Sequence, residues 1–289
     1  MAPSDEPQVV IVTGCTADGI GHALVLRFAE QGCTVYATAR RPESVGPVPD
    51  GVTVLALDVT SAASVSAAVE AVIQKSGRIN VLVNNAGMPC VGPLAEVNLG
   101  TARAAFETNV VGLLAVVQAV VPHMAAARRG RIVNVGSVVG YVPAPFAGVY
   151  AASKAAVHSM TDCMRLELAP LGIQVMLVAP GAIRSNFGTN ATVDTSHLKL
   201  YAPYADTVVA RAGLSQGARA TPAAVFACEV VGKVIGCRRM ARTVMFGHMV
   251  WMFQLLMTVP AWLRDWGLAR KFGLHVPYDK VKANAKKAA

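Results

Sequence analysis

The sequence has few charged residues: Asp, Glu, Lys and Arg make up 15% of its 289 residues, whereas hydrophobic residues make up 54%. Soluble domains average about 25% charged residues. A chain this apolar can bury a large core, which excludes disorder as its main state. Its length fits either two domains or one α/β domain.

The sequence also lacks the features of a secreted protein. Its six cysteines contain no C-x-x-C pair, and residues 1–8 carry neither the basic segment nor the apolar core of a signal peptide. We therefore expect no disulfide framework, no metal site and a cytoplasmic location.

Acidic residues are scarce at one end of the chain. Residues 1–232 contain 15 basic and 15 acidic residues, whereas residues 233–289 contain 11 basic and 2 acidic residues and carry the whole net charge of +9. All three tryptophans lie in the same segment. The neutral body argues against a nucleic-acid partner, and a basic, aromatic segment is typical of helices that lie on a membrane surface.

Short β-branched runs alternate with helical stretches through the first 180 residues. The pattern predicts strands at 9–13, 33–39, 52–57, 81–84, 131–135 and 173–178, and helices at 20–31, 61–75, 101–127 and 150–168. Such alternation predicts an α/β fold, a doubly wound parallel sheet of about seven strands flanked by helices. Residues 184–220 show little periodicity and are predicted to be a long loop that acts as a substrate lid. A helix at 222–234 and a strand at 242–246 follow.

A glycine-rich turn, Gly14-Cys15-Thr16-Ala17-Asp18-Gly19-Ile20-Gly21, joins the first predicted strand to the first helix. Glycine permits a tight turn and close approach of a pyrophosphate, and the helix N-terminus offers free N–H groups and a positive dipole end. A glycine cluster can also be an ordinary turn, but its place between a strand and a helix favours a dinucleotide site.

No carboxylate follows the second predicted strand, where a dinucleotide site usually has an acidic residue on the ribose 2′-hydroxyl. Arg40 and Arg41 stand there instead. A guanidinium can stack on adenine and pair with a 2′-phosphate, which favours NADP(H), although two arginines can also simply solvate a loop. Asp58, after the third strand, can accept from the adenine amino group or cap the next helix.

Several further motifs stand in a fixed order along the chain: Thr13-Gly14 with Gly19-Ile20-Gly21, Asn84-Asn85-Ala86-Gly87, Asn109, Ser137, Tyr150 with Lys154, and Pro180-Gly181. With these motifs, residues 8–185 resemble the short-chain dehydrogenase/reductase family. The resemblance implies a Rossmann-type fold, NADP(H) as cofactor and the catalytic residues Asn109, Ser137, Tyr150 and Lys154. One departure is that four residues, not the usual three, separate Gly14 from Gly19, which puts the details of the phosphate contacts in question.

The motifs and the resemblance together assign a set of cofactor-binding residues. They are Gly14, Thr16, Gly19, Ile20, Arg40, Arg41, Asp58, Val59, Asn85, Ala86, Gly87, Tyr150, Lys154, Pro180, Gly181, Ile183 and Ser185. We place the NADP-binding catalytic domain at residues 1–248 and an apolar, basic extension at 249–289.

The chemistry of the catalytic residues can also be argued from their types. Tyr150 and Lys154 lie four residues apart and share one helix face. A lysine ammonium near a phenol favours the phenolate, so we expect the pKa of Tyr150 to fall below about 10 and the residue to donate a proton near neutral pH. Ser137 follows the fifth strand, where its hydroxyl can hold a substrate carbonyl. The resemblance implies that Asn109 organises a water near Lys154 and that Lys154 also holds the nicotinamide ribose.

Within the family, the stretches at 14–21, 35–41 and 260–274 look like fungal NADPH-dependent 1-acyldihydroxyacetone-phosphate reductases. The first two also look like 17β-hydroxysteroid dehydrogenases, and fungal secondary-metabolite reductases share them. These likenesses imply reduction of a hydrophobic or lipid-like ketone to a secondary alcohol: an acyl ketone phosphate, a steroid, or a polyketide or terpenoid ketone. The generic apolar residues Val138, Val139, Phe146 and Phe187 are expected to line the substrate pocket.

Two functions of other classes stay open, a non-catalytic NADPH-binding scaffold and a membrane-tethering module. The four intact catalytic residues argue against the scaffold. Residues 249–259 are almost entirely apolar before Pro260, and interruptions make a full span of about 20 apolar residues unfavourable. The segment fits a helix on an endoplasmic-reticulum or lipid-droplet surface equally as well as one that covers the pocket or a partner. We expect a hydrophobic small-molecule ketone as ligand and a homodimer or tetramer.

Overall fold

The computed structural model describes residues 6–187 and 193–282. Its main feature is a seven-stranded sheet in which every neighbouring pair of strands is parallel. In sheet order the strands are β3 (Thr53–Ala56), β2 (Thr34–Ala39), β1 (Val9–Thr13), β4 (Val81–Asn84), β5 (Gly130–Val135), β6 (Ile173–Pro180) and β9 (Thr243–Phe246). The central strands form because their β-branched and apolar runs are buried on both faces, as in β1 and β4. The predicted α/β fold with a doubly wound parallel sheet is confirmed.

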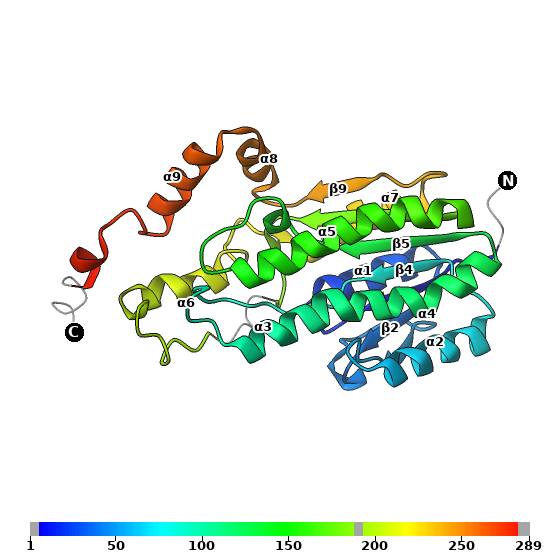
Figure 1. Ribbon diagram of the computed structural model, residues 1–289. Coiled ribbons are helices and arrows are strands. Elements are labelled where there is room, and N and C mark those ends of the chain that lie inside the picture. Colours follow the sequence, from blue (N-terminus) through cyan, green and yellow to red (C-terminus); the bar gives the residue numbers. More distant parts are fainter. Residues whose placement is uncertain (1–5, 188–192, 283–289) are drawn as a thin grey trace.

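Helices cover both faces of this sheet (Figure 1). One face carries α1 (Ile20–Glu30) and α7 (Ala223–Ile235), which pack against each other and against the apolar side chains of β1, β4 and β6. The other face carries α2 (Ala62–Ser76), α4 (Gly112–Ala126) and α5 (Gly148–Leu168) over a second apolar cluster. The two clusters together form the core, with the sheet between them.

The long helical stretch after β4 is not one regular helix. It consists of α3 (Leu99–Phe106), a π turn at Glu107–Val111 and α4. Within the described residues, only this stretch, Leu99–Ala126, is long and apolar enough to cross a membrane. Its side chains Val116, Val120 and Met124 are fully buried, so the stretch packs into the core against one face of the sheet.

The segment at 184–220 differs from its prediction as one long loop. A short strand, β7 (Ile183–Arg184), pairs with β8 (Thr221–Pro222), and α6 (Ala205–Gly213) forms between them after a 3₁₀ turn at Ala202–Tyr204. The helix forms because Tyr204 and Val208, four residues apart, bury one apolar face. The part of the predicted lid at 188–192 lies outside the described residues.

The chain after β9 forms two more helices, α8 (Val250–Thr258) and α9 (Ala261–Lys271), which meet at Pro260. They extend from the edge of the sheet toward α6 (Figure 1). Phe272, just after α9, packs edge-on against Phe146 and belongs to a third apolar cluster with Leu198, Tyr204 and Val208. The extension therefore folds back onto the region of α6. The predicted boundary after residue 248 falls between β9 and α8, and residues 283–289 lie outside the described part.

Candidate active site

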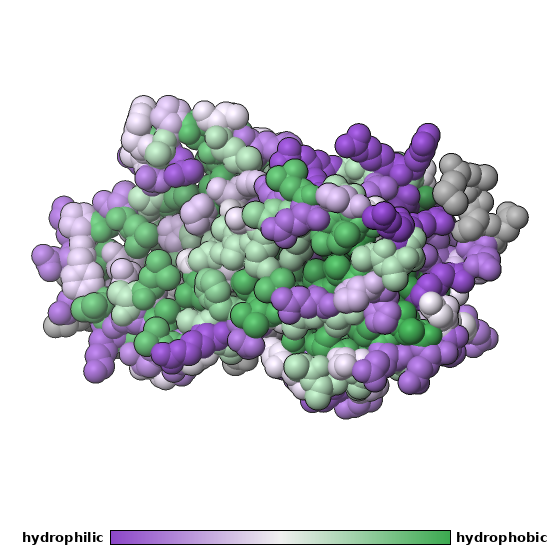
Figure 2. Space-filling view, turned by 45° about the vertical axis from the view of Figure 1, so that its right-hand side comes forward, coloured by the Kyte–Doolittle hydropathy of each residue, from purple (hydrophilic) through white to green (hydrophobic). Residues whose placement is uncertain are grey.

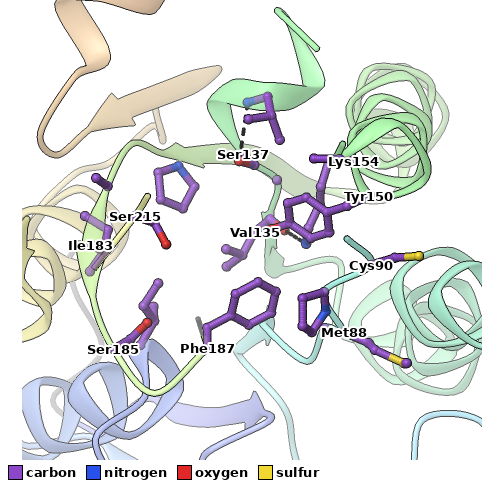
Figure 3. Close-up of a pocket in the computed structure, with 18 of the residues that line it drawn as sticks. Met88, Cys90, Val135, Ser137, Tyr150, Lys154, Ile183, Ser185, Phe187 and Ser215 are labelled. Carbon is purple, nitrogen blue, oxygen red and sulfur yellow. Dashed lines mark hydrogen bonds between the residues drawn. The ribbon is translucent and has the colours of Figure 1, made fainter. Parts of the chain in front are cut away.

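A cavity of about 730 Å³ lies at the carboxyl ends of the parallel strands, where the strand order reverses between β1 and β4. Ligands bind at this position in open α/β sheets. One end of the cavity, the cofactor end, is lined by the loops after β1, β2, β3 and β4. The other, the substrate end, is lined by residues of α6, α8 and α9. Ser137, Tyr150 and Lys154 lie between the two ends (Figure 3).

The glycine-rich loop approaches the neighbouring backbone closely. Gly14 has φ +70, and a Cβ added there would lie 2.7 Å from Cα of Ala86. A Cβ on Gly21 would lie 2.5 Å from the carbonyl oxygen of Gly14. No side chain caps the N-terminus of α1, whose N-cap residue is Gly19. The loop therefore presents bare backbone and a helix N-terminus to the cavity, which is a cradle for phosphate.

The additional residue of this loop is accommodated locally. Asp18 takes a left-handed conformation with φ 58, and the N–H of Ala17 donates to the carbonyl of Ser44 at 2.9 Å. Thr16 and Val45 form an antiparallel bridge. The longer loop is thus fixed to the segment after β2, and Gly14, Thr16, Gly19 and Ile20 still line the cavity.

The cofactor end carries Arg40, Arg41, Asp58 and Val59 on the loops after β2 and β3. Asp58 accepts hydrogen bonds from the N–H and the hydroxyl of Thr60, at 2.9 and 2.7 Å. These bonds, with a contribution from the charge of Arg40, hold the pKa of Asp58 below its ordinary value. The cap of α2 is Ser61, so Asp58 does not have the helix-capping role that its sequence position also allowed.

The segment after β4 is anchored to β1 through one hydroxyl. Thr13 Oγ1 accepts from the N–H groups of Asn85 and Ala86, both at 3.0 Å, and Asn85 Nδ2 donates to the carbonyls of Thr13 and Gly14. Asn85, Ala86 and Gly87 all line the cavity. These bonds tie the floor of the cofactor end to the glycine-rich loop.

Asn109 lies inside the π turn between α3 and α4 and is 1% exposed. Its amide donates to the carbonyl of Met88 at 3.0 Å and to Ser153 Oγ at 2.9 Å, and its oxygen accepts from the N–H of Met88 at 2.7 Å. A Cβ on Gly87 would lie 3.3 Å from that oxygen and 3.6 Å from Lys154 Nζ. Asn109 thus joins the loop after β4 to α5 close to Lys154, behind the cavity lining.

The side chains of Ser137, Tyr150 and Lys154 meet at the centre of the cavity (Figure 3). Lys154 Nζ donates to the carbonyl of Val135 at 2.9 Å and lies 5.8 Å from the ring centre of Tyr150. On the open side, the ring of Phe187 lies 5.7 Å from that of Tyr150. The three residues come from the loop after β5 and from one face of α5, as predicted.

Burial governs the protonation of this group. It raises the pKa of Tyr150 to about 12, while the hydrogen bond with Ser137 and the charge of Arg211 act in the opposite direction. It lowers the pKa of Lys154 to about 8. The expectation that Lys154 brings the pKa of Tyr150 below its usual value is therefore wrong, because the cost of desolvating a phenolate exceeds the attraction of the nearby charges. At neutral pH Tyr150 retains its proton and Lys154 remains charged.

His158 fixes the backbone at Ser137 through a hydrogen bond. Its Nε2 accepts from the backbone N–H of Ser137 at 3.3 Å, which places the imidazole proton on Nδ1. Its ring centre lies 4.4 Å from that of Tyr141, with the two rings tilted by 47°. A Cβ on Gly136 or Gly140 would collide with the imidazole, at 2.3 and 2.5 Å. Burial, aided by the charge of Lys154, lowers the pKa of His158 to about 4, so the ring is neutral at pH 7. Sequence analysis missed this residue.

The loop after β6 closes the cavity on the side opposite Tyr150, where Figure 3 places Ile183 and Ser185. Gly181 approaches the carbonyl of His248 so closely that a Cβ would lie 2.3 Å away. The N–H of Ser185 donates to Gln216 Oε1 at 2.8 Å. The four residues predicted between the end of β6 and the start of the lid, Pro180, Gly181, Ile183 and Ser185, all line the cavity.

The substrate end is mainly apolar. Val138, Val139 and Phe187 line it as expected, and they are joined by residues of the extension that sequence analysis did not single out: Met249, Met252, Phe253, Leu256 and Leu268. Phe146 was expected there but does not line the cavity. Its backbone has φ 63, and its ring packs between Tyr201 and Phe272 in the third apolar cluster.

Comparison with known proteins identifies the family to which the chain belongs. The family model for short chain dehydrogenases matches residues 8–195, more than half of the chain. The chain belongs to the short-chain dehydrogenase/reductase family. It is an oxidoreductase of this family, which acts on CH–OH and C=O groups with NAD(P).

Individual members of the family are similar over most of the chain. A short-chain dehydrogenase of Penicillium ochrochloron is 36% identical over 90% of this chain and 96% of its own length. The NADPH-dependent 1-acyldihydroxyacetone phosphate reductase of Schizosaccharomyces pombe is 36% identical over 68% of this chain and 69% of its own. The structure of a short chain dehydrogenase of Burkholderia cenocepacia in complex with NADP is 26% identical, with a TM-score of 0.71 over 92% of this chain and 98% of that one.

The cavity of this short-chain dehydrogenase/reductase fits the dinucleotide that the family uses. The bare glycine loop would hold the pyrophosphate. Asp58 and Lys154, which line the same cavity, would hold the adenine and the nicotinamide ribose. Besides His158, sequence analysis missed Arg211, Gln216 and Lys271, because the segment that carries them was expected to be a loop or a tail. The spacing of Tyr204, Val208 and Arg211 is the helical signal that was available for α6.

Proposed function

We propose that the protein is an NADPH-dependent carbonyl reductase that converts a hydrophobic or lipid-like ketone, such as an acyl ketone phosphate, to a secondary alcohol. The observation that supports this most is that a protonated Tyr150, with Ser137 and Lys154, faces a cavity whose far end is covered by the apolar side chains of α8 and α9. A long apolar body would be bound there away from water.

Each catalytic residue has a distinct role in this proposal. Ser137 donates its hydroxyl hydrogen to the substrate carbonyl oxygen and holds it beside Tyr150. Tyr150 gives its proton to that oxygen, and the charged Lys154 stabilises the phenolate that is left. NADPH, when bound, supplies the hydride to the carbonyl carbon. Asn109 holds the backbone of Met88 and the hydroxyl of Ser153. In this proposal it also organises a water that returns the proton through Lys154.

The cofactor proposed is NADP(H) rather than NAD(H). Arg40 and Arg41 follow β2 and are exposed at the cofactor end, and Asp58 is already engaged with Thr60. A guanidinium on the 2′-phosphate is a charge-assisted contact that contributes roughly 1.5–3 kcal/mol. The 1-acyldihydroxyacetone phosphate reductase of Schizosaccharomyces pombe is named as NADPH-dependent.

The test of the reductase function is a substrate panel read out by NADPH oxidation. The panel holds a long-chain acyl ketone phosphate, a steroid ketone and a polyketide-like ketone, each with full-length protein. Reduction of the first with the highest kcat/KM supports the proposal, whereas reduction of only the steroid or polyketide ketone favours a steroid-type or secondary-metabolite ketoreductase. Binding of NADPH without turnover of any ketone would favour the non-catalytic scaffold.

We also propose that the outer face of α8 and α9 lies on a membrane or lipid-droplet surface that faces the cytoplasm. The inner face of these helices lines the cavity, while Trp251, Trp262 and Trp266 on the outer face are 70, 71 and 54% exposed. Arg270 stacks on Trp266, with its guanidinium 4.5 Å from the ring centre. Exposed indoles beside basic residues suit the headgroup region of an anionic surface. Substitution of the exposed tryptophans separates this role from the reductase function, because it changes the outer face of α8 and α9 and keeps the inner face that lines the cavity.

We also propose a homodimer or tetramer that forms through the surface of α3, α4 and α5. These helices and the π turn between α3 and α4 leave apolar side chains exposed, among them Phe106, Val111, Leu114 and Leu166. Figure 2 shows hydrophobic surface across the middle of the molecule on the side of these helices. A second copy would cover this surface, and light scattering during gel filtration measures the mass that decides it. No nucleic-acid partner is proposed.

A further inference from the structure

The substrate end of the cavity contains a cation that the mechanism above does not use. Arg211 lies in the last turn of α6 and lines the same cavity as Tyr150 and Ser137. It is close enough to Tyr150 for its charge to lower the pKa of the hydroxyl. An arginine in this position is inside the reaction chamber rather than on the outer surface.

Arg211 has no partner within the described part of the chain. Its Nε is buried and makes no hydrogen bond there, and no carboxylate of residues 6–187 or 193–282 forms an ion pair with it. Burial lowers the pKa of its guanidinium below the ordinary value. A partly buried cation without a partner costs free energy in the folded protein, so a site of this kind is stabilised by an anion that binds to it.

The surroundings indicate where the anion comes from. Among the described lining residues, Asp58 is the one carboxylate, and it lies at the cofactor end, bonded to Thr60. The substrate end has a second cation, Lys271 at the end of α9, and polar groups on Ser215 and Gln216. The apolar side chains Met252, Phe253 and Leu256 of α8 line the same cavity. This arrangement matches a molecule with an oxyanion at one end and an apolar body.

We propose that Arg211 binds an anionic group, a phosphate or a carboxylate, that the ketone substrate carries near its reacting carbonyl. The inference specifies the chemistry of the substrate, and it therefore rests on the proposed reductase function. The planar guanidinium can hold two oxygens of such a group, with Lys271 as a second charge at the rim. The anion would orient the ketone so that its carbonyl meets Ser137 and Tyr150, and its apolar chain would extend along α8.

Kinetics with matched ketones test this inference. The experiment compares the native protein with Arg211→Gln, Arg211→Lys and Arg219→Gln. The last is the control, because Arg219 is exposed and lies outside this cavity. The ketones are palmitoyl dihydroxyacetone phosphate and the same compound without phosphate, and a long-chain keto acid and its methyl ester. Arg211→Gln should lower kcat/KM for the charged ketones roughly 10-fold to 100-fold, mainly through KM, and leave the neutral ones within about twofold. Arg211→Lys should restore part of the loss, and the control should resemble the native protein.

The phosphate and carboxylate pairs decide which oxyanion is the better ligand. An equal loss for charged and neutral ketones would overturn the inference. So would an unchanged preference in Arg211→Gln, or a loss that follows the dissociation constant of NADPH, since Arg211 would then contact the cofactor.

A binding measurement keeps the inference separate from the reductase function. Calorimetry with decyl phosphate and the NADPH-bound protein should give binding that Arg211→Gln weakens at least about tenfold, while decyltrimethylammonium should not bind in either. If no ketone is reduced but this pattern holds, the reductase proposal fails and the anion site stands. If ketones are reduced but decyl phosphate binds both proteins equally, the anion site fails and the reductase stands.

Discussion

The two ends of the cavity are built in different ways. The cofactor end is formed by backbone: the bare loop around Gly14, the helix N-terminus at Gly19 and the segment held by Thr13. The substrate end is formed by side chains from α6, α8 and α9, which reach the cavity from late in the chain. Backbone geometry constrains the sequence strongly, whereas an apolar wall accepts many residues. A change at the cofactor end should therefore affect every ketone alike, and one at the substrate end should discriminate among ketones.

The largest effect is expected where the two ends meet. Tyr150→Phe keeps the ring against Phe187 but removes the proton that the carbonyl oxygen receives. We expect reductase activity to fall by at least about a hundredfold for every ketone, the scale of one general acid, with NADPH binding retained. Initial rates and fluorescence titration with NADPH measure the two quantities. Normal turnover by the variant would remove Tyr150 from the mechanism.

At the cofactor end, Arg40 should decide between the two dinucleotides. We expect the native protein to prefer NADPH over NADH by about 10-fold to 100-fold in kcat/KM, as a lost charge-assisted contact predicts. Ala39→Asp with Arg40→Gln should shift the preference toward NADH, and by the same factor for each ketone tested. The control is Arg103→Gln, because Arg103 is an exposed residue of α3 that lies outside the cavity. Equal use of both dinucleotides by the native protein would contradict the assignment.

On the outer face of the substrate end, Trp251→Ser with Trp262→Ser should weaken binding to anionic liposomes several-fold without changing reduction of a soluble ketone. The indoles and the basic residues act together, and each basic residue near such a surface contributes on the order of 1 kcal/mol. Co-sedimentation at low and high salt measures the binding, which should weaken in salt without vanishing. Val225→Ser on α7 is a matched exposed control. If the native protein stays in the supernatant at low salt, the membrane proposal fails and α8 and α9 serve only to cover the pocket.

Stability, rather than rate or binding, is the quantity that the buried His158 beside Ser137 should change. Its pKa is about 4 in the folded protein and about 6.5 in an unfolded chain, so between these values only the unfolded chain binds the proton. Stability should therefore decrease as pH falls from about 6.5 to about 4, by up to about 3 kcal/mol from this residue. Thermal unfolding should show a shallower pH dependence over that range for His158→Gln than for the native protein, a difference of several degrees. Parallel curves would show that His158 is already protonated when folded.

The sequence could indicate residues of the cofactor end because the features of that end are local, and these residues line the cavity. The glycine loop, Asn85 and the i, i+4 pair of Tyr150 and Lys154 each require a residue type at a fixed place on a strand end or helix face. The strands were placed within one or two residues for the same reason, since buried parallel strands have continuous β-branched runs.

The substrate end could not be predicted in this way. Phe146 was misplaced because its left-handed backbone turns the ring toward Phe272, a contact between residues 126 positions apart. The pKa of Tyr150 was predicted with the wrong sign because its burial depends on the packed loops around it, including Phe187, and not on its neighbours in the helix. The role of α8 as a wall depends on how the chain turns at Gly247 and Met249, both with positive φ.

The π turn at Glu107–Val111 lets the helix between β4 and β5 contain a residue that the core does not need. A π turn contains one residue more than an α turn and takes that residue up within its own wider turn, so the helix after it keeps its direction and its face. Deleting one residue there would therefore leave Val116 and Val120 of α4 in the core. The deletion would instead move Asn109 out of its place between Met88 and Ser153. The extra residue thus serves the cavity rather than the core, and a chain shortened at this turn should keep its fold while Asn109 no longer joins the loop after β4 to α5.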